Sequence, residues 1–202
     1  MNDPVSPEYK AALASLGGEV AYLVAPSNGH WLHLMEWQAI YPKAELYISP
    51  GVEQKAPQLK YRKILEDGKV ESEWEQDFSG QCVLHGKKIE EVLFLHRPSS
   101  SLLVADIVMH LSDEAFRQDG SRPNFAMRML GSMSGARNRV RPGFIWRAFG
   151  FAQKADGRQK LRGVVEEWKP HRVIPSHGQV LEGNAEEMAQ KLRSCWSAYL
   201  PE

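Results

Sequence analysis

The sequence predicts an α/β fold, and three features of the chain indicate it. The first third alternates helical and strand-like segments, from the helical pattern of SPEYKAALASLGG to the strand pattern of AELYISPG. Three apolar runs with short connections follow in the middle, which predicts antiparallel strands. The last third is largely helical, with one short strand pattern in HRVIPSHG. We therefore expect a layered domain whose sheet pairing is at least partly parallel.

The N-terminal part is expected to run helix, strand, helix, strand. Ser6 suits the N-cap of the first helix and Pro7 suits its first position. The run EVAYLVAPS predicts a buried strand, because it is apolar, contains β-branched residues and ends at Pro26. A helical pattern then covers residues 32–40, and AELYISPG predicts the second strand.

The middle and C-terminal parts are expected to contain three further strands, a short strand near VIP and several helices. The predicted strands are Gln81–His85, Glu91–Leu95 and Ser101–Ile107. The predicted helices are Asn124–Leu130, Gly143–Phe151, Ala155–Trp168 and the amphipathic segment NAEEMAQKLRSCWSAYL. Asn184 is expected to cap the last of these helices.

The composition is that of a globular protein, and we expect one domain over residues 1–202. The net charge is zero, which argues against a nucleic-acid or membrane-surface protein, since these usually carry a basic excess. No apolar run approaches the roughly 18 residues of a membrane span, and the N-terminus has no apolar signal core. Cys82 and Cys195 lie far apart and form no metal-type pair. A reducing, cytoplasmic location is the simplest interpretation.

Residues of metal-binding type lie at the ends of predicted strands or in the loops that follow them. They are His30, His33, His96, Asp106 and His177. Loops at strand ends are where a rigid sheet presents binding groups, so these side chains are expected to converge. Zinc binds imidazole nitrogens and carboxylate oxygens. A single loop histidine is more often a surface residue, and Asp106 has the alternative role of capping a following helix.

Three stretches in this order resemble the metallo-β-lactamase superfamily: APSNGHWLHLMEWQAIYPKAELYISPG, EEVLFLHRPSSSLLVADIV and VIPSHG. The sequence resembles more closely a family of uncharacterised metallo-β-lactamase-like domains of unknown function. The resemblance covers about residues 4–178. It implies a four-layer αββα sandwich that lacks the N-terminal strands of the superfamily. One sheet would then have an unpaired edge, which favours a homodimer.

The resemblance also assigns ligand positions. In the superfamily motif T-H-x-H-x-D-H, the first His corresponds to Asn28 and the Asp to Leu32, so two ligands are missing. The positions that keep a ligand are His30 and His33 in this motif, His96 in the next, the bridging Asp106 and the final His177. One metal set would be His30, His96 and Asp106; the other would be His33, His177 and Asp106. Because both sets need Asp106, we expect one metal ion.

The resemblance implies a metal-dependent hydrolase of a small-molecule substrate, with one zinc or similar divalent ion, iron and manganese being alternatives. Asp106 and His177 are the expected catalytic residues. Glu36, one turn beyond His33, is a further candidate for acting on the attacking water. The alternatives are a non-catalytic relative that binds a small molecule or partner, and an oxidoreductase with iron in the same site.

A basic segment, GARNRVRPGFIWR, has two interpretations. Arg137, Arg139, Arg141 and Arg147 could bind a phosphate or carboxylate, because arginine offers paired donors to such groups. The more ordinary interpretation is a solvated basic face.

Overall fold

The computed structural model describes residues 6–112 and 139–200. The predicted helix Asn124–Leu130 lies outside these residues. The strands are β1 (Tyr22–Ala25), β2 (Glu45–Ile48), β3 (Lys63–Ile64), β4 (Phe78–His85), β5 (Glu90–His96), β6 (Ser101–Val104), β7 (Met109–His110), β8 (Val140–Arg141), β9 (Arg172–Pro175) and β10 (Leu181–Glu182). The helices are α1 (Pro7–Ser15), α2 (Leu34–Ile40), α3 (Val52–Lys55), α6 (Phe144–Phe149), α7 (Lys154–Gly163) with a π-helical turn η1 (Val164–Trp168), and α8 (Ala185–Cys195).

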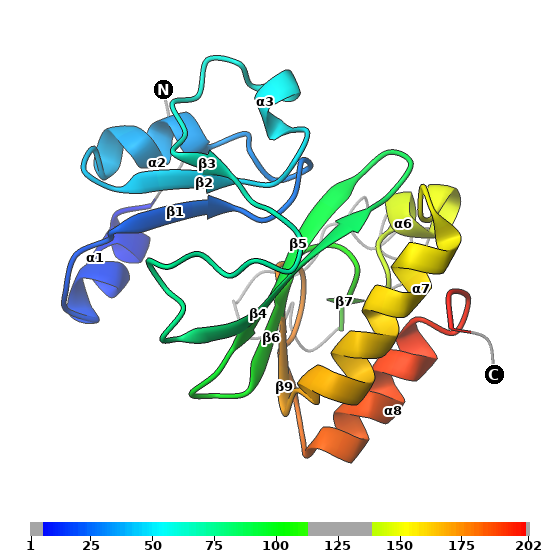
Figure 1. Ribbon diagram of the computed structural model, residues 1–202. Helices are drawn as coiled ribbons and strands as arrows, with labels where there is room; N and C mark the ends of the chain where they lie inside the picture. Colours follow the sequence, from blue (N-terminus) through cyan, green and yellow to red (C-terminus); the bar gives the residue numbers. More distant parts are fainter. Residues whose placement is uncertain (1–5, 113–138, 201–202) are drawn as a thin grey trace.

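Two sheets form the centre of the fold (Figure 1). The first has the order β1-β2-β3 and is parallel. The second has the order β10-β9-β6-β5-β4, in which β4, β5 and β6 are antiparallel neighbours, as the short connections predicted. In the same sheet β6 and β9 are parallel. These directions decide which strand ends meet at one edge.

The strands β2, β4 and β5 are buried on both faces over most of their length, and successive residues contribute to different layers of the core. On β2, Leu46 and Ile48 pack into one cluster while Tyr47 packs into another. On β5, Phe94 packs with Tyr47 between the two sheets, and Leu93 faces the opposite way. The alternation follows from the two-residue period of a strand. The apolar runs in the sequence are continuous because both faces of each sheet are covered.

Helices cover the two outer faces (Figure 1). Leu34 of α2 and Val52 of α3 pack on the outer face of the first sheet. The outer face of the second sheet is covered by α7, η1 and α8, through residues such as Leu161, Val165 and Leu192. The order helix, sheet, sheet, helix is the four-layer αββα arrangement that the sequence analysis expected.

One predicted strand is shorter than expected, and its end has a local cause. The prediction placed a strand at Ser101–Ile107, but β6 ends at Val104. The backbone amides of residues 105–107 donate to the carboxylate of Glu91 instead of a neighbouring strand. A side chain therefore terminates the ladder, which periodicity alone does not reveal.

The first sheet has an edge at β1, because in the described part of the chain β1 pairs only with β2. Pairing of two copies through this edge stays a prediction. Cys82 and Cys195 are both buried as free thiols. No helix of the described residues is both long and apolar enough to cross a membrane.

The cap of α8 gives a testable prediction for the fold. Asn184 Oδ1 accepts from the amides of Glu186 and Glu187, each at 3.0 Å, and the Glu187 carboxylate accepts from the Asn184 amide at 3.2 Å. Asn184→Ala is expected to lower the free energy of unfolding by about 1 kcal/mol, measured by urea denaturation. Asn184→Asp should stay within a few tenths, because it keeps the acceptor. Equal losses in both variants would contradict a capping role.

Candidate metal centre

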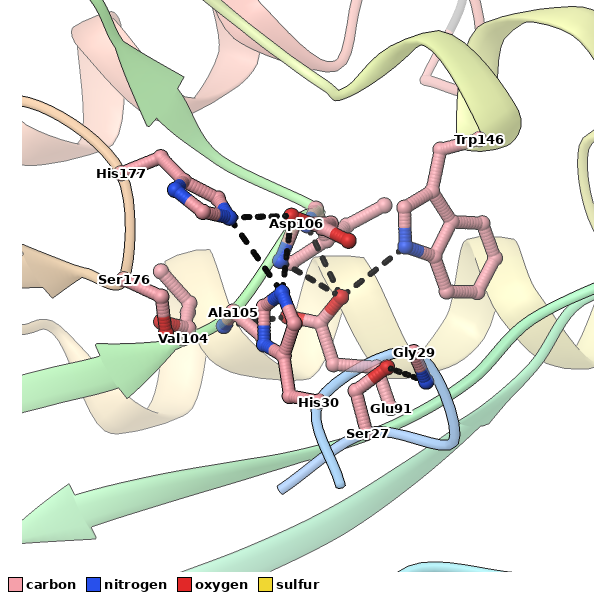
Figure 2. Close-up of polar contacts among 11 residues, drawn as sticks. Ser27, Gly29, His30, Glu91, Val104, Ala105, Asp106, Trp146, Ser176 and His177 are labelled. Carbon is pink, nitrogen blue, oxygen red and sulfur yellow. Dashed lines mark hydrogen bonds and ion pairs between the residues drawn. The ribbon is translucent and has the colours of Figure 1, made fainter. Parts of the chain in front are cut away.

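Three side chains of metal-binding type meet at one point (Figure 2). Nε2 of His30 lies 3.6 Å from Oδ1 of Asp106, and Nε2 of His177 lies 3.4 Å from the same oxygen. The two Nε2 atoms are 3.3 Å apart. The rings of His30 and His177 are nearly perpendicular, with an interplanar angle of 75°. The structure thus brings together His30, Asp106 and His177 of the predicted ligands.

Asp106 and His177 lie together because β6 and β9 are parallel neighbours. Val104, the last residue of β6, is opposite Pro175, the last residue of β9. Asp106 and His177 each follow two residues later. Parallel strands end at the same edge of a sheet, so both side chains emerge there.

His30 reaches this edge because the loop after β1 is attached to the start of β5. The amide of Val92 donates to the carbonyl of Pro26 at 2.7 Å, and the amide of Asn28 donates to the carbonyl of Glu90 at 3.1 Å. Since β5 is antiparallel to β6, the start of β5 lies beside the end of β6. The loop that carries His30 is therefore held against the loop that carries Asp106.

The cluster is half-buried and suited to a cation. The side-chain exposures are 25% for His30, 18% for Asp106 and 45% for His177. Burial lowers the pKa of His30, which Asp106 opposes and His177 reinforces. A lowered pKa favours the neutral imidazole, which is the form that binds a metal ion.

His96 lies at the opposite ends of the strands from Asp106 and His177, beside the start of β6. It ends β5, and β5 runs opposite to β6, so the ends of the two strands point in opposite directions. Nδ1 of His96 lies 2.7 Å from Oγ of Ser99, and its ring packs edge-on against Phe78. From the sequence, all strand ends were expected to lie on the same side of the sheet, which holds only for parallel strands.

His33 and Glu36 also remain outside the cluster of three. His33 immediately precedes α2 and its side chain is 65% exposed, with Nδ1 at 3.8 Å from Oε1 of Glu36. Each expected ligand set is therefore incomplete. The observed group takes His30 and Asp106 from one set and His177 from the other.

Asn28 and Leu32 stand where the superfamily motif has ligands, and neither is part of the group of three converging side chains. Asn28 is buried beside Gly51, and its backbone carbonyl accepts from Nζ of Lys55 at 2.7 Å. Gly51 adopts φ +85°, and a Cβ on it would lie 2.8 Å from Nδ2 of Asn28. Leu32 is 68% exposed. Asn28 thus packs against a turn and Leu32 faces solvent.

Glu91 is a residue of this region that the sequence analysis missed. It is fully buried, and its carboxylate accepts four hydrogen bonds, from three backbone amides and from the indole of Trp146. Burial raises the pKa of Glu91 to about 7, while the N–H donors favour the carboxylate. The signal was in the sequence. Glu90 and Glu91 are adjacent on a strand that is buried on both faces, so one of them must point into each layer.

An apolar groove of about 720 Å³ lies beside His30. Its walls include Trp31, Leu34, Trp37 and Tyr41, and among the described residues no lysine, arginine, aspartate or glutamate lines it. The groove offers an apolar surface next to the three converging side chains.

The basic segment lines a different cavity. Arg139, Arg141 and Arg147 border a space of about 940 Å³ together with residues of α8. None of His30, Asp106 or His177 lines it. Arg137 lies outside the described residues, and anion binding by this segment stays a prediction.

Comparisons with known proteins bear on the fold. No protein-family model matches the chain, and no curated protein matches it. Among solved structures the chain is similar to TMB-1, with 11% identity over 93% of this chain and 74% of that chain and a TM-score of 0.54. It is also similar to the DIM-1 metallo-β-lactamase, with 12% identity over 95% of this chain and 79% of that chain and a TM-score of 0.53. The chain has the metallo-β-lactamase fold, as the sequence analysis expected.

Proposed function

We propose that this chain, with its metallo-β-lactamase fold, is a metal-dependent hydrolase that binds one divalent ion at His30, Asp106 and His177. The observation that supports it is the spacing of the three ligand atoms, 3.3, 3.4 and 3.6 Å. A tetrahedral zinc ion with bonds of about 2.0–2.1 Å holds its ligand atoms about 3.3–3.4 Å apart. The spacing therefore fits a zinc-sized ion without large movements of the side chains.

The donor set supports the same proposal. Two imidazoles and one carboxylate leave a fourth position of a zinc site open for water or substrate, as catalytic sites require. The same set also holds iron(II) in oxygenases, so an iron-dependent oxidoreductase is a second candidate. The identity of the ion that copurifies with the protein separates these two chemistries.

A bound ion would lower the pKa of a water molecule and polarise the oxygen of a substrate carbonyl or phosphoryl group. Oδ1 of Asp106 faces both histidines, while Oδ2 has no hydrogen bond within the described part of the chain. We assign to Oδ2 the role of accepting a proton from the attacking water. His177, the most exposed of the three side chains, borders the open side of the site.

The groove beside His30 suggests the kind of substrate. Its walls are mostly apolar and aromatic, and in the part of the chain that the structure describes no Lys, Arg, Asp or Glu side chain lines it. We expect a small molecule whose apolar part lies along Trp31 and Trp37, with the bond to be cleaved beside His30.

Metal analysis tests the proposal directly. Protein purified without added metal is expected to contain close to one equivalent of zinc or a similar ion, or to take it up when soaked after chelation. The chelated protein should lose hydrolysis of ester, thioester or phosphodiester test substrates, and added Zn²⁺ should restore it. Less than about 0.2 equivalents of any transition metal, unchanged by soaking, would contradict the proposal.

A non-catalytic binding protein is the alternative, favoured by the positions of Asn28 and Leu32, which offer no ligand to the cluster. One bound equivalent of metal without turnover of any test substrate would support it. Loss of a measured hydrolysis in His30→Ala would rule it out.

A further inference from the structure

A single buried glutamate connects two of the three loops that form the candidate metal centre. The side chain of Glu91 contacts the loop that carries Asp106, and its backbone contacts the loop that carries His30 (Figure 2). Glu91 is not among the three converging ligands. Its contacts show what it does instead.

The carboxylate binds three consecutive backbone amides. Oε1 accepts from the amide of Ala105 at 2.7 Å, and Oε2 accepts from the amides of Asp106 at 3.0 Å and Ile107 at 2.9 Å. The indole Nε1 of Trp146 on α6 donates to Oε2 at 2.9 Å. Because three consecutive amides bond to one carboxylate, the backbone of residues 105–107 curves around it. Asp106 is the middle residue of this curve.

The backbone of Glu91 holds the other loop. Glu91 forms a bridge with Ser27, whose Oγ accepts from the amide of Gly29 at 3.1 Å. The carbonyl of Ser27 accepts from the amide of His30 at 3.0 Å. Any displacement of Glu91 would thus be transmitted to both His30 and Asp106.

The burial of this carboxylate carries an energetic cost. Glu91 has no exposed surface, and within the described residues no lysine, arginine or histidine forms an ion pair with it. A buried charge is tolerated only when it is fully hydrogen-bonded, and here both oxygens have donors. Oε2 accepts three of these hydrogen bonds and Oε1 accepts one.

We propose that Glu91 is a positioning residue of the metal centre: through its side chain and its backbone it holds Asp106 and His30 at ligand distance. This inference rests on the proposed function, because positioning matters only where an ion is bound. Partners that orient metal ligands typically contribute about 10–100-fold to metal affinity.

The test uses Glu91→Gln, which replaces one acceptor oxygen by an NH₂ group that faces N–H donors. Two measurements are made on the whole protein. The affinity for Co²⁺ is measured by calorimetry together with the visible spectrum of the bound ion, and hydrogen exchange of the amides of residues 105–107 is measured without metal. We expect at least about tenfold weaker Co²⁺ binding, an altered spectrum and faster exchange confined to these amides.

Glu71→Gln is the matched control. Glu71 is also a buried carboxylate, but its partner is Nζ of Lys63 at 2.7 Å, and it forms no hydrogen bond or ion pair with His30, Asp106 or His177. This variant is expected to lose stability while keeping the Co²⁺ affinity and spectrum. If Co²⁺ affinity fell only because the protein was less stable, it would fall in Glu71→Gln as well as in Glu91→Gln. That result would overturn the proposal.

The outcomes separate the two proposals. If the unmodified protein binds Co²⁺ and Glu91→Gln binds it with the same affinity and spectrum, the positioning role is wrong and the proposed function stands. If the unmodified protein binds no metal, the proposed function fails, and unchanged exchange at residues 105–107 would also remove the role of Glu91 in holding Asp106. Should Glu91→Gln fail to fold, Trp146→Phe removes one donor only. It is expected to weaken Co²⁺ binding by several-fold, and unchanged binding would count against the proposal.

Discussion

Single alanine substitutions of the four histidines are expected to divide into two groups. His30→Ala and His177→Ala should weaken Zn²⁺ or Co²⁺ binding by more than about 100-fold, because losing a ligand costs more than losing one of its outer partners, which is worth about 10–100-fold. His33→Ala and His96→Ala should bind these ions as the unmodified protein does. The physical reason is position, since only His30 and His177 lie within 3.6 Å of Oδ1 of Asp106.

The measurement is calorimetric titration of chelated protein, with circular dichroism to show that each variant is folded. His96→Ala is the internal control, because the sequence analysis placed His96 in the first ligand set. Its side chain contacts Ser99 and Phe78 at the opposite edge of the sheet. A large loss of binding in His96→Ala together with none in His177→Ala would contradict the site.

Gly178→Ala is expected to have the largest effect on stability among the predictions made for this chain. Gly178 adopts φ +98°, and a Cβ on it would lie 1.9 Å from the carbonyl oxygen of His110. That oxygen cannot move easily, because it accepts from the amide of Gln179 at 3.0 Å and His110 pairs with Val140 on β8. We expect the free energy of unfolding to fall by more than about 2 kcal/mol, since backbone strain alone costs about 1–2 kcal/mol. Metal affinity should fall as well, because His177 is the preceding residue.

Gly68→Ala is the matched control for this substitution. Gly68 has a similar φ of +67°, but a Cβ on it would meet nothing within 4 Å. It should lose only the strain contribution, about 1 kcal/mol, and keep its metal affinity. Equal losses of stability in the two variants, measured by urea denaturation, would show that the contact with His110 is unimportant.

The local pattern of the sequence determined most of the helices and strands. Ser6 and Asn184 act as N-caps as predicted, and Pro7 takes the first position of α1. The strands of the central sheets follow from apolar runs bounded by turns. These features depend on residues near in sequence, which is why periodicity and capping reveal them. The short β3, β7, β8, β10 and α3 were not predicted, because two to four residues carry too little pattern.

The sequence also determined which residue types could hold a metal ion, but only the tertiary structure decided which of them meet. His96 and Asp106 both follow apolar runs, and nothing local distinguishes them. The directions of β5, β6 and β9 place the end of β5 at the opposite edge from the ends of the other two. Strand direction depends on pairing between distant segments, so it is invisible in any window of sequence.

Glu91 is a second residue whose partners the local sequence does not reveal. Two adjacent acids at the start of an apolar strand indicate that one carboxylate must be buried. Its partners are the amides of residues 105–107 and the indole of Trp146, which lie far along the chain. The sequence by itself therefore indicates that an acidic side chain points into the core, and the fold decided that it lies against Asp106, because only packing brings these segments together.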